Sequence, residues 1–175
     1  RSPFKPDGPV AGAEDRIAML RAGLEDLHAQ RVGIATLELD RADAAPSYTI
    51  DTLRAIRGKL GPMPALRLLI GADQAREFHR WREARAIIKI APPVVMLRAG
   101  DSAARSQLLI AMAPHWDGEE LAAWESRIVD IPRIDASSTD IRRIVAQSGP
   151  DDPRLAALTP GSVIEEIRRR GLYRA

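Results

Sequence analysis

The sequence predicts an α/β protein with a parallel sheet and helices on both of its faces. Three observations favour this class. Helix-like and strand-like stretches alternate along the chain, the apolar runs are short enough for buried parallel strands, and Gly and Pro residues separate them. Apolar residues make up 45% of the 175 residues and charged residues 29%, which is typical of a globular protein.

Amphipathic patterns predict the helices. The first runs from Ala13 to His28, because Ile17, Leu20, Leu24 and Leu27 recur three and four residues apart on one face. The same spacing and the positions of capping residues predict five more helices: Thr49–Leu60, Gln74–Ala86 in one piece or two, Ser102–Met112, Glu119–Ser126 and Ser137 to near Gly149. A final helix follows Thr159-Pro160 and closes at Gly171.

Four apolar runs are predicted as strands: Val32–Leu39, Leu66–Ile70, Val94–Leu97 and Arg127–Ile131. Ligands of open parallel sheets bind outside the carboxyl ends of the strands. The loops after these strands are therefore where functional residues are expected.

Composition excludes several classes of function. No run reaches the ~18 apolar residues of a membrane helix, and the chain has no Cys for a disulfide, a thiolate metal site or a thiol nucleophile. The 26 basic and 24 acidic residues are interspersed and aromatic residues are only 4%, so neither a duplex nor a single-stranded nucleic acid is an expected partner. The three His residues lack metal-ligand spacing, so no protein metal site is predicted, and the absence of a signal-like segment predicts a cytoplasmic protein. Nothing in the sequence indicates an oligomeric state.

The strongest candidate site is the run Ala136 to Arg142, ASSTDIR. Ser137, Ser138 and Thr139 stand where a helix is predicted to begin, and the N–H groups and dipole of a helix N-terminus bind phosphate. A cation such as Arg142 in the first turn is unfavourable for the helix itself but suits a bound anion. A plain N-cap explains the hydroxyl residues equally well, so both interpretations stay open.

A second candidate follows the predicted strand Leu66–Ile70. The carboxylate of Asp73 is placed to accept hydrogen bonds from ribose hydroxyls, and Gly71 allows a close backbone approach. Asp73 taken alone is better explained as an N-cap for the helix predicted at Gln74.

Two further segments contain aromatic residues. In Phe78-His79-Arg80-Trp81-Arg82, Trp81 suits stacking on a planar heterocycle with Arg82 balancing its charge, although a lone Trp is more often a core residue. In Pro46-Ser47-Tyr48-Thr49, Tyr48 suits a pocket wall and Thr49 is predicted to cap the next helix. Lys5, between two prolines, is a candidate phosphate ligand or a plain loop residue.

These segments occur together in a known family. The chain resembles the bacterial nicotinate-nucleotide adenylyltransferases of the nucleotidyltransferase superfamily, from about Pro3 to Arg174. The likeness is carried by FKPDGP, PSYTIDTLR, LIGADQ, FHRW, VVMLRAG, SSTDIRR and GLYR, in the family's order.

The resemblance implies a Rossmann-like nucleotidyltransferase fold in a single domain, with residues 1–130 as the core and 131–175 as a C-terminal helical part. It implies transfer of AMP from ATP to nicotinate mononucleotide, with Mg²⁺ accompanying ATP. By this likeness ATP is held by Gly71, Asp73, Ser137, Ser138, Thr139 and Arg142. Nicotinate mononucleotide is held by Lys5, Tyr48, Thr49, Trp81 and Arg82, while the role of Arg98 stays open.

The chain also departs from the family pattern. It has no G-x-F-x-P-x-H-x-G-H segment, so the first βαβ unit and the expected catalytic histidines are predicted to be missing from this chain. Phe4 stands where the family commonly has His, and Ala136 replaces an Ile. Two alternatives follow: an adenylyltransferase for another acceptor (nicotinamide mononucleotide or phosphopantetheine), or a nucleotide-binding fragment without catalysis.

Overall fold

The computed structural model describes residues 11–28, 31–40, 47–98, 103–132 and 134–174. It contains two compact units. One, Ala45–Arg133, is called the sheet unit, and the other, Pro3–Ala44 with Ile134–Ala175, is called the helical unit. Lys5 and the FKPDGP segment lie outside the described residues.

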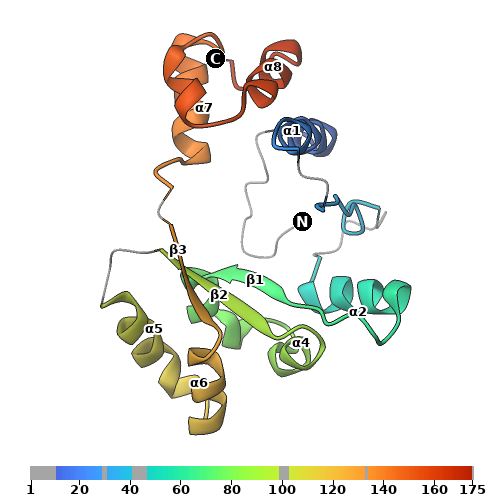
Figure 1. Cartoon of the computed structure of the whole chain (residues 1–175), viewed down its shortest axis with the longest axis vertical. Helices are drawn as coiled ribbons and strands as arrows, with labels where there is room; N and C mark the ends of the chain where they lie inside the picture. The colour runs from blue at the N-terminus through green and yellow to red at the C-terminus, as the bar shows by residue number, and fades with distance from the viewer. Residues whose placement is uncertain (1–10, 29–30, 41–46, 99–102, 133, 175) are drawn as a thin grey trace. The chain divides into compact units, whose positions relative to one another are not determined.

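The sheet unit contains three parallel strands in the order β1-β2-β3 (Figure 1). They are β1 (Leu68–Gly71), β2 (Pro93–Arg98) and β3 (Ile128–Ile131). Ile70 pairs with Val95, and Val95 pairs with Ile128, so these buried residues line up across the sheet. The predicted α/β class with a parallel sheet is confirmed.

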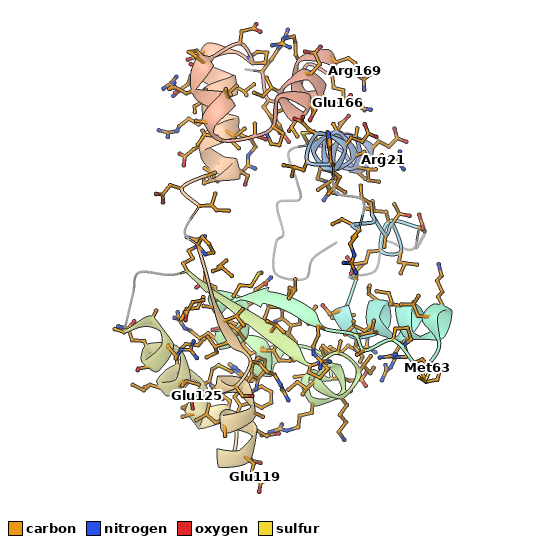
Figure 2. The ribbon with its side chains drawn as sticks, viewed as in Figure 1. Arg21, Met63, Glu119, Glu125, Glu166 and Arg169 are labelled. Atoms are coloured by element: carbon orange, nitrogen blue, oxygen red, sulfur yellow. The ribbon has the colours of Figure 1, made fainter. Side chains whose placement is uncertain are left out.

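Helices connect and flank these strands. They are α2 (Thr49–Leu60), α3 (Ala72–Arg76), the 3₁₀ turn η1 (Phe78–Arg80), α4 (Ala84–Ile90), α5 (Ala104–Met112), η2 (Ala113–His115) and α6 (Gly118–Glu125). Gly61, at a φ of 71°, ends α2 as its sequence predicts. The turn beyond it carries Met63, whose side chain projects into solvent and is 89% exposed (Figure 2).

Successive residues of each strand point to opposite faces of the sheet, so buried and exposed side chains alternate. Ile70, Val95 and Ile128 join a buried cluster to which the helices contribute Ile50, Phe78, Leu108 and Trp124 among others. Leu69 and Val129, which point the opposite way, stay exposed. This apolar cluster fixes the strands and the loops that follow them.

The helical unit consists of α1 (Ala13–Asp26), α7 (Ser138–Ser148), the 3₁₀ turn η3 (Pro153–Ala157) and α8 (Gly161–Arg169). Its buried apolar cluster is smaller and consists of Ile144, Val145, Leu155 and Ile167. Helix α1 packs along α8, and Met19 joins the cluster from α1. No helix in the described ranges is long and apolar enough to cross a membrane.

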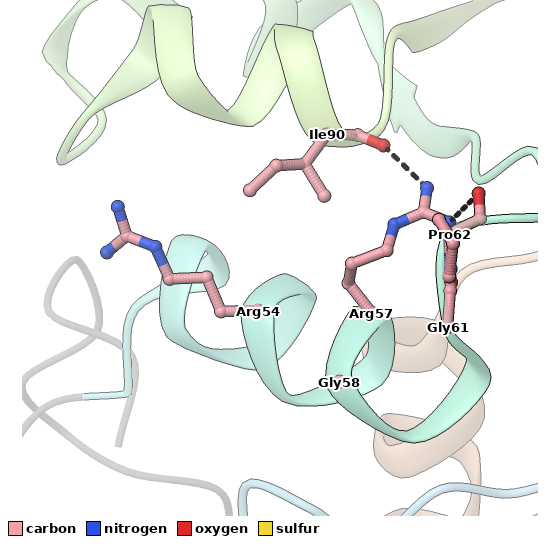
Figure 3. Close-up of a pocket in the computed structure, with 6 residues that line it drawn as sticks. All are labelled: Arg54, Arg57, Gly58, Gly61, Pro62 and Ile90. Carbon is pink, nitrogen blue, oxygen red and sulfur yellow. Dashed lines mark hydrogen bonds between the residues drawn. The ribbon is translucent and has the colours of Figure 1, made fainter.

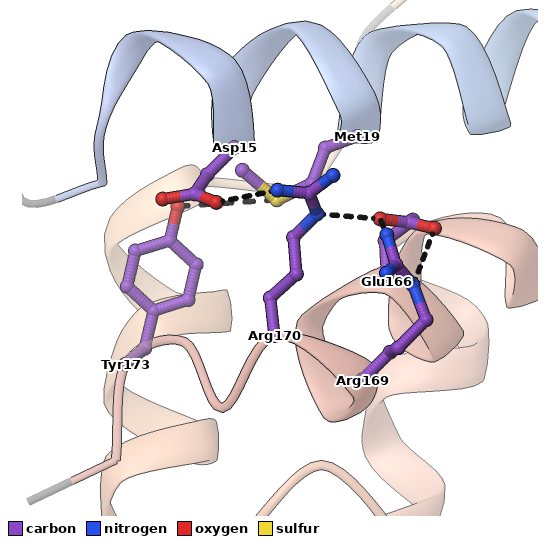
Figure 4. Close-up of polar contacts among 6 residues, drawn as sticks. All are labelled: Asp15, Met19, Glu166, Arg169, Arg170 and Tyr173. Atoms are coloured by element: carbon purple, nitrogen blue, oxygen red, sulfur yellow. Dashed lines mark hydrogen bonds and ion pairs between the residues drawn. The ribbon is translucent and has the colours of Figure 1, made fainter.

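Charged side chains tie α1 to α8 (Figure 4). Arg170 donates to Asp15 of α1 at 2.8 Å and to Glu166 at 2.8 Å, and Arg169 donates to the same Glu166 carboxylate at 2.7 Å. At the other end, the Ser162 hydroxyl donates to the Ala22 carbonyl at 2.9 Å. The two arginines lower the pKa of Glu166 to about 2, because their N–H groups bond its charged form.

The strand predicted at Val32–Leu39 is wrong. Residues 31–40 belong to the helical unit and form irregular chain that ends in a turn, where the Leu39 N–H donates to the Thr36 carbonyl at 2.7 Å. The described part of this unit contains no strand that could take the backbone hydrogen bonds of another. Val32 and Leu39 are accordingly exposed, as a buried strand would not allow.

Candidate functional site

Trp81 follows η1 and lies partly exposed against the apolar core. Its ring stacks on Phe78 with centroids 4.8 Å apart and planes inclined at 27°. Phe78 is fully buried and makes an edge contact with Trp124 at 5.1 Å. Trp81 therefore packs on the core, as a structural Trp does, yet keeps part of its surface available on a rigid aromatic base.

Arg82 meets the beginning of α2. Its guanidinium lies 4.8 Å from the centre of the Tyr48 ring, within the range of a cation–π contact. The carboxylate of Asp51 is 3.9 Å away, beyond hydrogen-bond distance. Within the described part of the chain no hydrogen bond uses the Arg82 guanidinium, so its donors remain available to a ligand.

The start of α2 differs in one detail from its prediction. Tyr48, with an extended backbone at φ −105° and ψ 138°, occupies the N-cap position. Thr49 already belongs to the helix, so the prediction that Thr49 caps it is wrong. Tyr48 and Thr49 together stand at this N-terminus, and Tyr48 is the residue in contact with Arg82.

The end of β1 carries the second candidate. Gly71 is the N-cap of α3, and its N–H donates to the Gln74 side chain at 3.3 Å. Asp73 lies in the first turn of α3, so the alternative that it caps a helix starting at Gln74 is wrong. Its exposed carboxylate has no hydrogen bond or ion pair among the described residues. A Cβ added at Gly71 would meet no atom within 4 Å, so the space beside this backbone is open.

The SSTDIR motif begins α7. The Ser137 hydroxyl accepts a hydrogen bond from the Asp140 N–H at 3.1 Å, which confirms the N-cap interpretation for this residue. Ser138 and Thr139 form the exposed first turn. Arg142 reaches back toward that turn and donates to the Thr139 hydroxyl at 3.3 Å. Arg143 instead pairs with Asp140 at 2.6 Å.

The predicted site residues are divided between the two units. Tyr48, Thr49, Gly71, Asp73, Trp81 and Arg82 belong to the sheet unit, and Ser137, Ser138, Thr139 and Arg142 belong to the helical unit. Arg98 ends β2 and is exposed. Within the sheet unit the structure brings Tyr48 and Arg82 together from segments more than thirty residues apart.

Sequence reasoning missed an ion pair beside these residues. Arg54 of α2 donates to both carboxylate oxygens of Glu83, at 3.0 and 2.6 Å. These hydrogen bonds lower the pKa of Glu83 and raise that of Arg54. Arg54 belongs to the PSYTIDTLR segment, so the resemblance to the family could have drawn attention to it. The residues around Glu83 contain no pattern that would predict a role for Glu83.

A shallow pocket lies one turn further along α2 (Figure 3). It is lined by Arg54, Arg57, Gly58, Gly61, Pro62 and Ile90. Arg57 is already engaged there, since it donates to the carbonyls of Gly61 at 3.1 Å, Pro64 at 2.7 Å and Ile90 at 3.3 Å. None of the predicted site residues lines this pocket.

Comparisons with known proteins agree with this architecture. Residues 1–144 match the model of the cytidylyltransferase-like family. The probable nicotinate-nucleotide adenylyltransferase of Roseiflexus castenholzii is 35% identical over 174 residues, covering 98% of this chain and 78% of the relative. Those of Stenotrophomonas maltophilia and Desulfatibacillum aliphaticivorans are 35% and 31% identical, over 95% and 98% of this chain and 78% and 81% of the relatives.

The parallel sheet and the family match define the class of protein as a cytidylyltransferase-like nucleotidyltransferase. Within that class, the chain belongs to the nicotinate-nucleotide adenylyltransferase family.

Proposed function

We propose that the protein transfers the adenylyl group of ATP to nicotinate mononucleotide, giving nicotinate adenine dinucleotide and pyrophosphate. The observation that carries this proposal is the arrangement of Trp81 and Arg82. The indole ring of Trp81 stacks on the core residue Phe78 and is partly exposed. The next residue, Arg82, has a guanidinium whose donors are available. An aromatic ring that bears a carboxylate matches both features.

The reaction needs no protein nucleophile. A phosphate oxygen of nicotinate mononucleotide attacks the α-phosphorus of ATP, a new P–O bond forms, and the bond from the α-phosphorus to the bridging oxygen breaks. Pyrophosphate leaves with that oxygen. Catalysis is then a matter of aligning the two phosphates and neutralising their charge.

We assign the ATP phosphates to the first turn of α7. The Ser137 hydroxyl accepts the Asp140 N–H, and the earlier N–H groups of the first turn are the ones that an anion would use. Arg142 beside Thr139 adds a positive charge there. The free carboxylate of Asp73 and the open space at Gly71 suit a ribose.

Mg²⁺ is proposed to arrive with ATP, where it neutralises charge on the phosphate oxygens. The described residues contain no group of three or more His, Asp or Glu side chains placed to hold a metal ion. We assign the ion to the phosphate oxygens of the nucleotide.

Pyrophosphate release tests the proposal. The purified protein is given ATP and Mg²⁺ with nicotinate mononucleotide, nicotinamide mononucleotide or phosphopantetheine. Release that depends on the nicotinate form supports the proposal, because Arg82 favours a carboxylate over a neutral amide. Preference for another acceptor would reassign the substrate. ATP binding with no release from any acceptor would indicate a nucleotide-binding fragment without catalysis.

A further inference from the structure

We propose that Arg54 and Glu83 are a positioning pair, which holds the Trp81–Arg82 turn in the conformation that receives the acceptor's ring and carboxylate. The inference rests on the proposed function for its ligand. Its structural part, that the pair sets the environment of Trp81, can be tested without any ligand.

The backbone at Glu83 requires support. Its φ of 54° and ψ of 44° lie in the left-handed region, which residues with a Cβ rarely adopt. Gly, Asn and Asp are the usual occupants, because Gly lacks a Cβ and the short polar side chains bond locally. Glu has neither advantage, so a contact outside the turn must favour this conformation.

Arg54 supplies that contact from another element. The two parallel hydrogen bonds, at 3.0 and 2.6 Å, join residues 29 positions apart and fix both the place and the orientation of the Glu83 carboxylate. Glu83 is also the N-cap of α4. The pair therefore holds the N-cap residue of α4 against α2.

A second arginine fastens the other end of α4. Arg57, three residues after Arg54 on α2, donates to the carbonyl of Ile90, the last residue of α4, at 3.3 Å. Helix α4 is thus held to α2 at both ends, and the preceding turn has little freedom to shift along it. Loss of the Glu83 contact would release the end that adjoins Arg82.

A change at Glu83 would reach Trp81 and Arg82, because these two residues come immediately before it in the chain. The Trp81 carbonyl accepts from the Ala84 N–H at 3.1 Å, so any change in the backbone at Glu83 moves the residues on either side. Arg82 keeps its place over Tyr48 at 4.8 Å only while the turn has this conformation.

A matched ion pair offers the control. Arg85, two residues beyond Glu83, makes the same bidentate contact with Glu120 of α6, at 2.7 and 2.9 Å. Its guanidinium lies 5.1 Å from the centre of the Trp116 ring. Arg85→Gln therefore removes an equally well-formed exposed pair from α4 and leaves the proposed positioning pair intact.

The first experiment uses the ligand-free protein. The three Trp residues give three indole N–H signals in a ¹H–¹⁵N spectrum, and Trp81→Phe identifies the one from Trp81. Glu83→Gln and Arg54→Met should both shift the Trp81 signal, and Arg85→Gln should shift the Trp116 signal instead. An unchanged Trp81 signal in Glu83→Gln would overturn the proposal.

The second experiment measures binding of nicotinate mononucleotide by the quenching of tryptophan fluorescence. Glu83→Gln should raise the Kd about tenfold and leave the Kd for ATP within about twofold, and the double variant with Arg54→Met should be no worse than either single variant. Arg85→Gln should bind normally. If the wild-type protein fails to bind nicotinate mononucleotide, the proposed function is wrong, while the indole spectra still decide the positioning role. If Glu83→Gln binds as well as the wild type, the positioning proposal is wrong and the proposed function stands.

Discussion

The sheet unit and the helical unit are each stabilised by a different kind of interaction. Among the described residues, fourteen buried apolar residues form the core cluster of the sheet unit, including Phe78, Trp116 and Trp124, whereas the core cluster of the helical unit has four. The helical unit instead has charged contacts along α8, where Arg168 bonds Asp151 and Arg170 joins Asp15 to Glu166. The residues proposed for the acceptor therefore rest on apolar packing, while those proposed for the ATP phosphates rest on a small core reinforced by charge.

The largest effect is expected in the aromatic core of the sheet unit. Trp124 is 1% exposed and contacts Phe78 and Trp116. Trp124→Ala should lower the free energy of unfolding by about 3–5 kcal/mol, because it removes the buried ring and leaves a cavity. Urea denaturation measures this. Ile110→Ala, at a position 72% exposed, is the control and should change stability little. Equal losses in both variants would contradict the assignment of the core.

A smaller loss is expected from the core of the helical unit. Ile167 of α8 is 2% exposed, and Ile167→Ala should cost about 2–4 kcal/mol. Hydrogen exchange should show weaker protection in α1, α7 and α8, with the strands β1 to β3 unaffected. Ile134→Ala, 76% exposed in the same unit, is the control. Weakened protection in the strands would show that the two units unfold together.

Function offers a third contrast, between two adjacent arginines of α7. Arg142 turns toward the first turn of the helix, and Arg143 is paired with Asp140. Arg142→Ala should lower kcat/KM for ATP about tenfold, because it removes a cation facing the phosphates. Arg143→Ala should leave this value within about twofold. Similar kinetics for the two variants would remove Arg142 from the phosphate site.

Local signals predicted much of this molecule. Gly61 ended α2 as expected, and Ser137 capped α7 in agreement with one of the two interpretations that the sequence left open. Both outcomes follow from the fact that a cap depends on a residue and its immediate neighbours. The apolar runs before Gly71 and after Pro92 became β1 and β2 within two residues of their predicted bounds. The candidate residues in the loops after these strands followed from the general behaviour of parallel sheets.

Other features depend on partners distant in sequence. Val32–Leu39 has a strand-like composition, but a strand forms only where a neighbour accepts its hydrogen bonds. The left-handed backbone of Glu83 and its pairing with Arg54 depend on tertiary packing, so no local sequence pattern predicts them. The stacking of Trp81 on Phe78 was not predicted either, because a sequence identifies an aromatic residue but not the orientation of its ring.

The smallest predicted effect is a difference in acid sensitivity. The pKa of Glu166 is lowered to about 2 by Arg169 and Arg170, from an ordinary value of 4.5. A carboxyl whose pKa is lowered by folding stabilises the folded state above its unfolded pKa, and this contribution disappears as the pH falls from about 4.5 toward 2. The protection factors of α1 and α8 against hydrogen exchange, which are corrected for the intrinsic exchange rate at each pH, should therefore fall over this range. The fall should be modest, because the side chains of these pairs are partly exposed to solvent.

Glu166→Gln should flatten that pH dependence. Glu125→Gln is the control, because Glu125 on α6 has no ion pair within the described ranges. Unchanged acid sensitivity in Glu166→Gln would show that the network on α8 contributes nothing measurable.

The transfer of AMP itself is the most direct test of this account. ATP labelled at its α-phosphorus is incubated with Mg²⁺, nicotinate mononucleotide and the purified protein, and the products are separated. The account predicts that the label appears in nicotinate adenine dinucleotide, that nicotinamide mononucleotide accepts far less of it, and that Arg82→Leu narrows this difference. Label recovered only in ATP or AMP, with no dinucleotide formed, would contradict it.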